Sequence, residues 1–422
     1  MITQRTNGCC SHLQPGWNGT LIVALALSCG LLHPSACFAL GFRIPNQDAE
    51  ATARGNAFTA TADNPSAIYY NPAGIAFQPG LNAQYGAHII SINSEYHSFS
   101  GSSANSKFEI QPVPQLYITY MPSNSTLAYG VGVYAPFGLG LEWPENSSFR
   151  SLAVEGRMLY ANVNPVVAWK PASTFSISAG PTLNYSKVNL RQGLGLAPGD
   201  QFQYKGDDFG FGFNAGLLWQ PLTQLSFGAT YRSASTMNYS GTANSQTIPG
   251  LTGSARTKVK VDFPQFVIAG VSYRPTPDWN IEVNVDWTDW DVVKVLTFEG
   301  TRQIYGSDVQ LPLNWKASWL YELGVTRQLG NGWFVSGGYF FSQNSSPDRN
   351  FTPSIPDTDL HVGSLGFGKR SQHWHWAVSG QIITGPARTV RNSQSTSLVG
   401  ETADGTYKWF NQAVNFSIGY LF

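Results

Sequence analysis

From Leu81 onward the chain repeats strand-like runs that are joined by two alternating kinds of connection. The runs lie near 81–97, 112–121, 126–138, 156–170, 173–188, 207–220, 223–239, 257–274, 279–297, 314–328, 332–343, 360–369, 373–384 and 407–422. The short connections are Pro122-Ser123-Asn124, Pro171-Ala172, Pro221-Leu222-Thr223, Pro275-Thr276-Pro277, Gly330-Asn331-Gly332 and Arg370-Ser371-Gln372. The long, polar ones lie near 98–111, 139–155, 189–206, 240–256, 298–313, 344–359 and 385–406. Short turns at one rim and long loops at the other are typical of an outer-membrane β-barrel, and about fourteen strands satisfy its even number. A β-propeller would give more uniform gaps.

Within single runs, apolar and polar residues alternate. One parity of 279–290 holds Ile281, Val283, Val285 and Trp287, and the other holds Glu282, Asn284 and Asp286. The last run places Val414, Phe416, Ile418, Tyr420 and Phe422 on one face. In 314–326 the apolar parity is Trp315, Ala317, Trp319, Tyr321, Leu323 and Val325. Strands of a membrane barrel alternate in this way, with apolar residues toward lipid and polar residues toward the lumen.

Composition agrees with this fold class. Only 12% of residues are charged and 14% are aromatic, whereas about a quarter of the residues in ordinary soluble domains are charged. After residue 39 no stretch approaches the length of a membrane helix, which needs about 18 apolar residues. We therefore predict an all-β, transmembrane antiparallel barrel that crosses the outer membrane of a Gram-negative bacterium many times. The formal net charge is +0, which gives no electrostatic reason to expect a nucleic-acid partner.

Residues 1–39 have the pattern of a secretory signal peptide. Arg5 precedes an apolar run, Leu21 to Leu32, and Cys37-Phe38-Ala39 supplies the small residues read by a signal peptidase. A lipid anchor at Cys37 is the alternative. All four cysteines, Cys9, Cys10, Cys29 and Cys37, lie in this leader, so no disulfide is expected in the remaining chain.

Asp63 to Gly80, DNPSAIYYNPAGIAFQPG, contains two Asn-Pro pairs. Asn is a strong N-cap and Pro fits the first helical position, so we predict two very short helical turns. Such turns cannot bury themselves, and with the small-residue stretch from Gly41 they predict an N-terminal plug, the hatch, over 40–80, inside a barrel formed by 81–422. The alternative is a surface loop. Glycines at inward positions, namely Gly130, Gly132, Gly210, Gly212 and Gly216, fit either close approach of a plug or plain sheet curvature.

Several of these features together resemble the FadL-type outer-membrane transporters of long-chain fatty acids and other hydrophobic compounds. The resemblance covers about 41–422 and is carried by Gly41-Phe42, Asn71-Pro72-Ala73, VDWTDWDVV (285–293), LPLNWKASWLYELGV (311–325), SQNSSPDRNFTPSIPDTDL (342–360) with its Ile355-Pro356-Asp357, and the final Phe422.

This resemblance implies a fourteen-stranded barrel with a hatch, and uptake by diffusion without energy input. Outer loops would catch the substrate, an internal pocket would bind it, and a gap at a bent third strand would release it sideways into the membrane. It implies that Phe42 lies near the pocket and that Asn71, Pro72 and Ala73 form the hatch motif. Pro136, in the third run, marks the expected bend because Pro removes a ladder hydrogen bond. The alternative is that Pro136 only ends the strand.

The chemistry-bearing residues give no catalytic constellation, so we predict neither an enzyme nor a cofactor or metal site. Lys258, Lys260 and Lys316 lie on the polar parity of their runs, and we predict that they face the lumen near its outer mouth. A charge in an apolar lumen needs a partner. Asp262 is one candidate, and the carboxylate of a substrate is the other.

The predicted function is passive uptake of hydrophobic molecules, either long-chain fatty acids or aromatic and aliphatic hydrocarbons. The predicted partners are a hydrophobic small-molecule substrate and outer-membrane lipid, and the barrel is expected to be a monomer. A general diffusion porin for small polar solutes is the alternative, and an adhesin with functional loops is a third possibility.

Overall fold

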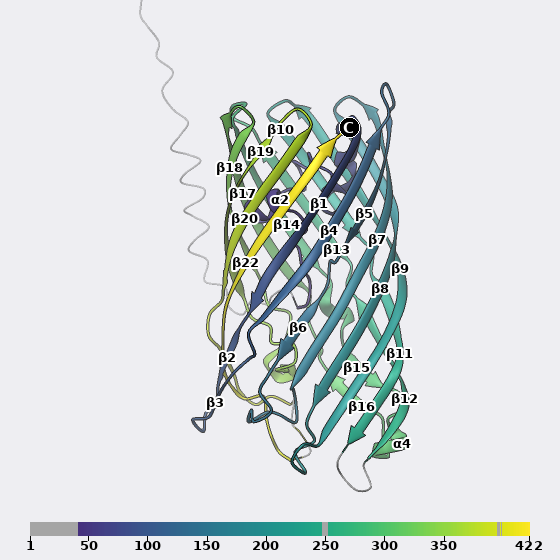
Figure 1. Cartoon of the computed structure of the whole chain (residues 1–422), viewed down its shortest axis with the longest axis vertical. Coiled ribbons are helices and arrows are strands. Elements are labelled where there is room, and N and C mark those ends of the chain that lie inside the picture. Colours follow the sequence, from purple (N-terminus) through teal and green to yellow (C-terminus); the bar gives the residue numbers. More distant parts are fainter. Residues whose placement is uncertain (1–40, 247–251, 395–396, 398) are drawn as a thin grey trace, which may run out of the picture. The chain divides into compact units, whose positions relative to one another are not determined.

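The computed structural model describes residues 41–246, 252–394, 397 and 399–422. The predicted signal peptide lies outside the described residues. Within them, fourteen wall strands form one closed antiparallel barrel, which confirms the predicted strand number (Figure 1). The wall consists of β1 (Gly80–Ile92), β4 (Glu109–Met121), β5 (Leu127–Tyr134) with β6 (Leu139–Glu142), β7 (Glu155–Ala172), β8 (Phe175–Gln192), β9 (Gln201–Leu222), β10 (Leu225–Arg232) with β11 (Ser235–Gln246), β12 (Gly253–Phe263) with β13 (Phe266–Tyr273), β14 (Trp279–Thr288), β17 (Ser318–Gly330), β18 (Trp333–Ser342), β19 (Leu360–Arg370), β20 (Trp374–Thr384) and β22 (Gly405–Leu421).

The barrel closes where β1 pairs with β22 on one side and β4 on the other. The register runs from Asn82 opposite Leu421 to Ser91 opposite Gln412. Closure leaves no unpaired first or last strand, which a membrane-spanning sheet requires because lipid offers no hydrogen-bond partner. No helix among the described residues has the length and apolar character needed to cross a membrane.

Short elements lie in the long connections. They are the strands β2 (Ser94–His97), β3 (Ser103–Asn105), β15 (Val295–Phe298), β16 (Val309–Pro312) and β21 (Arg388–Val390), and the helices η3 (Trp290–Val292), α4 (Arg302–Tyr305) and η4 (Asp348–Asn350). Figure 1 shows β2, β3, β15, β16 and α4 at one end of the barrel, which we call the long-loop end, and the chain terminus Phe422 at the other, the short-turn end. The predicted alternation of connections is thereby confirmed.

The alternation of faces holds along the membrane part of the wall. On β14, Val283 is 51% exposed whereas Asn284 and Glu282 are fully buried. The final strand β22 likewise exposes Val414 and Ile418 and buries Asn415. One residue of the predicted parity is wrong: Trp315 is fully buried, because β17 begins only at Ser318 and the preceding segment turns its side chains the other way.

Residues 41–79 form a buried N-terminal segment. It contains α2 (Ala49–Ala53), α3 (Ala67–Tyr70) and the 3₁₀ helix η2 (Pro72–Phe77). The two predicted turns are therefore present, whereas α2, capped by the Asp48 carboxylate on Ala51 N–H, was not anticipated. The glycine prediction is confirmed in part. A Cβ on Gly130 would lie 2.9 Å from Ile68 of α3, but Gly210 and Gly212 face other wall residues.

Candidate functional site

An aromatic chamber surrounds Phe42 inside the barrel. We define the chamber by six buried side chains: Phe42, Phe137, Tyr160, Phe263, Trp290 and Trp315. The ring centroid of Phe42 lies 4.7 Å from that of Trp290, 5.4 Å from Trp315, 5.5 Å from Phe263 and 6.0 Å from Phe137. The pairs with Trp290, Phe263 and Phe137 are edge-to-face, an arrangement that aromatic quadrupoles prefer. The packed rings are apolar and aromatic, as are the side chains that line binding sites for hydrophobic ligands.

The backbone before Phe42 approaches the chamber wall very closely. Gly41 has φ +58°, and a Cβ there would lie 2.7 Å from the ring of Trp315. Glycine alone combines that left-handed conformation with that proximity. Gly41-Phe42 in the sequence is therefore explained by packing against the two tryptophans.

The third wall strand is broken beside the chamber. β5 ends at Tyr134, β6 begins at Leu139, and Pro136 lies between them. The N-terminal segment pairs with this break: Ile44 N–H donates to Pro136 O at 2.8 Å, and Gly138 N–H donates to Phe42 O at 2.9 Å. Pro136 therefore interrupts the strand, in agreement with the predicted break in pairing. The N-terminal segment provides hydrogen-bond partners for backbone groups that the break leaves unpaired.

A gap in the ladder between β4 and β5 accompanies the break. Their pairing covers only Leu116 to Tyr120 of β4, although β4 pairs with β1 along its whole length. The direction of backbone hydrogen bonds alternates from residue to residue along an antiparallel strand. Because Phe422 N–H donates to Leu81 O across the β22–β1 pair, the backbone groups of the even-numbered residues of β4 point toward β5. Pro112 and Pro114 fall on that edge, where they have no N–H to donate. Sequence reasoning missed this proline pair, although QPVPQ at 111–115 was visible.

Buried ion pairs connect the N-terminal segment to β14. Arg43 contacts Asp286 at 2.7 Å and donates to Thr288 Oγ1 at 2.7 Å. Arg54 contacts Glu282 at 3.2 Å, which also accepts from Ala60 N–H at 2.8 Å. A carboxylate at this depth is tolerated only with such partners. These partners are more than 200 residues apart in sequence, which is why sequence reasoning named the acidic strand but not the arginines.

The Asn71-Pro72-Ala73 triplet ties the segment to the wall. Asn71 Oδ1 accepts from Ala73 N–H at 3.2 Å, and its Nδ2 donates to Thr59 O at 2.8 Å and Leu217 O of β9 at 2.9 Å. Ser176 of β8 donates to Ala73 O at 2.8 Å. The motif thus contacts two wall strands as well as its own segment.

The predicted orientation of the lysines is wrong. Lys258 and Lys260 are exposed on β12, and the alternate residues Val259 and Val261 are buried. Lys260 pairs with Asp262 at 2.9 Å, which is the alternative that the sequence left open. Lys316 is exposed as well. At the long-loop end the interior is the apolar chamber and the outside is polar, so the rule that polar residues face the lumen is reversed there.

A loop covers the chamber from the long-loop end. Ile355 of the loop 343–359 packs into the chamber's cluster, and Arg388 holds the loop through Asp357 O at 2.5 Å and Asp348 at 2.7 Å. The Asp357 carboxylate accepts from Ser345 N–H at 2.8 Å. Burial raises the pKa of Asp357, and burial together with Asp357 raises the pKa of Asp359 to about 6.

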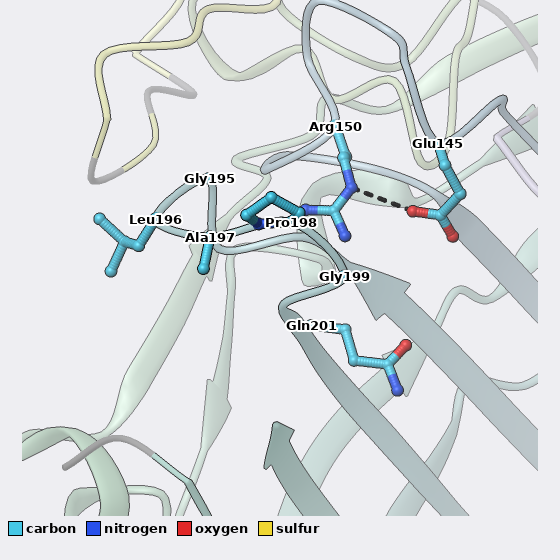
Figure 2. A pocket seen from close by; sticks show the side chains of 8 residues that line it. All are labelled: Glu145, Arg150, Gly195, Leu196, Ala197, Pro198, Gly199 and Gln201. Carbon is cyan, nitrogen blue, oxygen red and sulfur yellow. Dashed lines mark hydrogen bonds and ion pairs between the residues drawn. The ribbon is translucent and has the colours of Figure 1, made fainter. Parts of the chain in front are cut away.

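A cavity lies at the rim. It has a volume of about 630 Å³ and is lined by Glu145, Arg150, Gly195, Leu196, Ala197, Pro198, Gly199 and Gln201. Figure 2 shows the Arg150 guanidinium beside Glu145, to which it donates at 3.0 Å. Arg150 also contacts Asp200 at 2.5 Å, so the apolar Leu196 to Pro198 turn is held by ion pairs.

Taken together, a closed fourteen-stranded antiparallel barrel and a buried aromatic cluster beside a broken strand define the class of outer-membrane transport barrels. A family model described as outer membrane protein transport protein (OMPP1/FadL/TodX) matches residues 30–406, and the chain belongs to this family. It is therefore an outer-membrane protein of the Gram-negative type, and members of the family are transport proteins.

Individual relatives agree. The chain is 22% identical over 393 residues to the long-chain fatty acid transport protein of Escherichia coli K12, covering 81% of this chain and 87% of that one. It is 21% identical over 360 residues to outer membrane protein P1 of Haemophilus influenzae, covering 73% and 77%. Among solved structures, a Pseudomonas aeruginosa FadL homologue gives a TM-score of 0.80 at 20% identity, covering 91% of this chain and all of that chain. The Pseudomonas putida toluene transporter TodX gives 0.68 at 17%, covering 88% and 97%.

Proposed function

We propose that this barrel takes up hydrophobic molecules by passive diffusion, long-chain fatty acids or hydrocarbons, and releases them sideways into the membrane. The rim cavity beside Leu196 captures the molecule, the aromatic chamber binds it, and the gap between β4 and β5 is the exit. The observation that carries the proposal is the position of Phe42, which lies in the chamber while its own backbone pairs with the broken strand.

Within this proposal, residues 1–39 are a signal peptide, 40–80 a hatch and 81–422 the barrel. Phe42 contacts the substrate, whereas Asn71, Pro72, Ala73 and Pro136 hold the hatch and the gap. The barrel acts as a monomer in contact with outer-membrane lipid and without a nucleic-acid partner. Burial of the segment among wall side chains favours this function over a general diffusion porin, which needs an open aqueous lumen. Rapid sugar flux through liposomes that contain the intact protein would contradict the proposal.

A reversible lock on the gap provides the main test. A Cβ on Gly140 of β6 would lie 3.3 Å from Cγ of Gln111 on β4, so the double variant Gln111→Cys/Gly140→Cys places two thiols within reach of a disulfide. The sequence has no cysteine after residue 39, so no other thiol competes. Oxidation is expected to stop uptake of a radiolabelled long-chain substrate into the membrane, and reduction is expected to restore it.

The matched control is a pair on an intact seam. Leu323 of β17 and Tyr339 of β18 are opposed in register and both face outward, so Leu323→Cys/Tyr339→Cys introduces a cross-link without touching the gap. Its oxidation should leave uptake unchanged. Equal uptake by the oxidised and reduced gap variants, with cross-linking verified by mass spectrometry, would show that substrate does not leave between β4 and β5.

A further inference from the structure

Cationic side chains gather on the outer surface of the wall at the long-loop end. Four of them are exposed and form no ion pair or side-chain hydrogen bond among the described residues: Lys187 of β8, Lys205 of β9, and Arg256 and Lys258 of β12. We call these four side chains the basic patch. Lys260 on the same face of β12 is neutralised, because it pairs with Asp262 at 2.9 Å.

Strand register brings the basic patch together. On β8 and β9, Lys187 lies opposite Asp207. Asp207 in turn lies opposite Ser240 of β11, and Ser240 lies opposite Lys258. One pair further along, Lys205 and Arg256 both lie opposite Thr242 of β11. Since neighbouring strands are about 4.8 Å apart, the two rows place all four cations within about 14 Å.

The basic patch is confined to one side of the barrel. The long-loop halves of β1, β4, β18, β19 and β20 contain neither Lys nor Arg. On β22 the exposed Lys408 lies 3.9 Å from Glu95. The carboxylates that adjoin the basic patch are Asp207 within it and Glu299 at its margin, so its four cations are only partly balanced. An anion on this side of the wall would therefore be attracted.

Aromatic side chains fix the depth of the basic patch in the membrane. Tyr185 and Phe209 are opposed in register, and their ring centroids lie 4.8 Å apart. Phe209 and Phe211 are 68% and 71% exposed. Exposed aromatic rings of a barrel mark the membrane–water interface. Lys187 lies two residues beyond Tyr185 toward the long loops, about 6–7 Å along the strand, which is the level of the lipid head groups. Long loops of such barrels are extracellular, so these are the head groups of the outer leaflet.

A polar cavity adjoins the basic patch on its side away from the aromatic rings. It has a volume of about 800 Å³ and is lined by Thr297, Glu299, Gly300, Arg302, Gly306, Ser307, Asp308 and Gln310. We call it the hairpin cavity, because these residues belong to the β15–β16 hairpin and to α4. Lys258 N–H donates to Glu299 O at 3.0 Å, and Glu299 N–H donates to Lys258 O at 2.9 Å. The hairpin is thereby joined to β12, and Figure 1 shows α4 beside that strand.

The side chains of the hairpin cavity suit a ligand rich in hydroxyl groups. Its walls offer hydroxyl, amide, carboxylate and guanidinium groups, which together donate and accept hydrogen bonds. Arg302 is held in place by Asp308, to which its Nε donates at 3.0 Å. A ligand that occupies both places therefore needs phosphates or other anions for the basic patch, hydroxyl groups for the cavity, and apolar chains for the aromatic surface below.

We propose that the basic patch and the hairpin cavity together bind the phosphorylated sugar head group of a glycolipid from the outer leaflet. The four cations contact its phosphates, since charge-assisted hydrogen bonds to phosphate are strong and Lys and Arg near a membrane attract anionic lipid. The cavity takes its sugar, and its acyl chains lie along β8 and β9. This inference goes beyond the proposed function, because it concerns the outer surface of the wall and not the lumen.

The test uses bisphosphorylated lipid A as the probe, added to the full barrel in neutral detergent and measured by native mass spectrometry. The wild type should retain one lipid A. Lys187→Gln/Lys205→Gln/Lys258→Gln should bind it about 100-fold more weakly, because each lysine near an anionic lipid contributes about fivefold. The corresponding triple change to Arg should keep most of the affinity. Lys294→Gln/Arg391→Gln/Lys408→Gln removes three exposed cations elsewhere at the long-loop end and is the matched control, which should bind as the wild type does.

Two further comparisons separate the phosphate from the sugar. Lipid A without phosphates should bind the wild type as weakly as the Gln variant binds the phosphorylated form. Ser307→Trp, which fills the hairpin cavity, should weaken lipid A but not phosphatidylglycerol, which has a phosphate and no sugar. Heat resistance on an unboiled gel verifies that each variant is folded. Equal retention of lipid A by the wild type and the folded Gln variant would overturn the proposal. Equal affinity of the wild type for phosphatidylglycerol and lipid A would also overturn it, because the cavity would then contribute nothing.

Discussion

Asn71 is expected to hold the N-terminal segment against the wall, and its replacement should release the segment while the barrel stays folded. Asn71→Ala removes a cap on Ala73 N–H, worth about 1 kcal/mol, and two buried hydrogen bonds to Thr59 O and Leu217 O, worth about 0.5–1.5 kcal/mol each. The total is about 2–4 kcal/mol. Because about 1.4 kcal/mol changes an equilibrium tenfold, the detached population of the segment should rise by a factor of about 30 to 1,000.

Two measurements follow this change. Hydrogen exchange should show reduced protection of residues 67–77, and liposomes should leak small solutes faster. The wall strands hold one another through their own ladder, so the barrel should still resist heat on an unboiled gel. Asn71→Asp is the matched variant, since it keeps the Oδ1 acceptor for Ala73 but loses both donors of Nδ2. It should therefore reproduce most of the defect.

A second substitution reaches the same contact from the wall. A Cβ on Gly216 of β9 would lie 2.4 Å from Asn71 Oδ1 and 3.0 Å from Pro72, so Gly216→Ala should loosen the segment in the same direction. Unchanged exchange and unchanged leakage in Asn71→Ala, Asn71→Asp and Gly216→Ala together would show that the triplet does not hold the segment.

Two further predictions concern the chamber and the short-turn end. Phe42→Ala should cost about 3–5 kcal/mol of local packing and should weaken the binding of charged and uncharged ligands alike. The fluorescence emission of Trp290 and Trp315 should shift to the red as water enters. An unchanged emission spectrum and unchanged ligand affinity would contradict the role of the chamber. Burial raises the pKa of Glu50 to about 7 although it contacts Arg370 at 2.5 Å, so its contribution to stability is full below about pH 4.5 and is lost as the pH rises through 7. Hydrogen exchange at residues 49–53, corrected for the intrinsic pH dependence of the exchange rate, should therefore show a loss of protection between pH 5 and 8 in the wild type. The loss should be much smaller in Glu50→Gln, and an equal pH dependence in both proteins would refute this prediction.

The fold could be predicted from the sequence because every strand of a membrane barrel follows the same local pattern. Alternating faces on β14 and β22 and the two kinds of connection each follow from lipid contact at every strand. The Asn-Pro turns were also local, since capping acts within a few residues. Phe42 was placed near a pocket only through family resemblance, and its contact with substrate stays a prediction.

The site residues were less accessible because their partners come from distant strands. The lysines of β12 were misplaced since the parity rule depends on what lies outside the wall, and water replaces lipid near the long loops. Nothing in the sequence around Arg43 and Asp286 predicts that they form an ion pair. Arg232, the buried last residue of β10, could not be recognised for a different reason: its property is the absence of an anionic partner among the described residues, which only a three-dimensional arrangement can reveal.

The two prolines on the open edge of β4 have a consequence for how an exit can be regulated. A seam between ordinary strands opens only when hydrogen bonds break, and it closes again when they re-form. Pro112 and Pro114 have no N–H to offer β5, so these positions of the seam have no ladder bonds to break or restore. Passage through the proposed exit would therefore not be limited by the unzipping of backbone pairs. Whatever control exists must come from side chains and backbone that occupy the opening, and the N-terminal residues that pair with Pro136 and Gly138 are the ones in place to exert it.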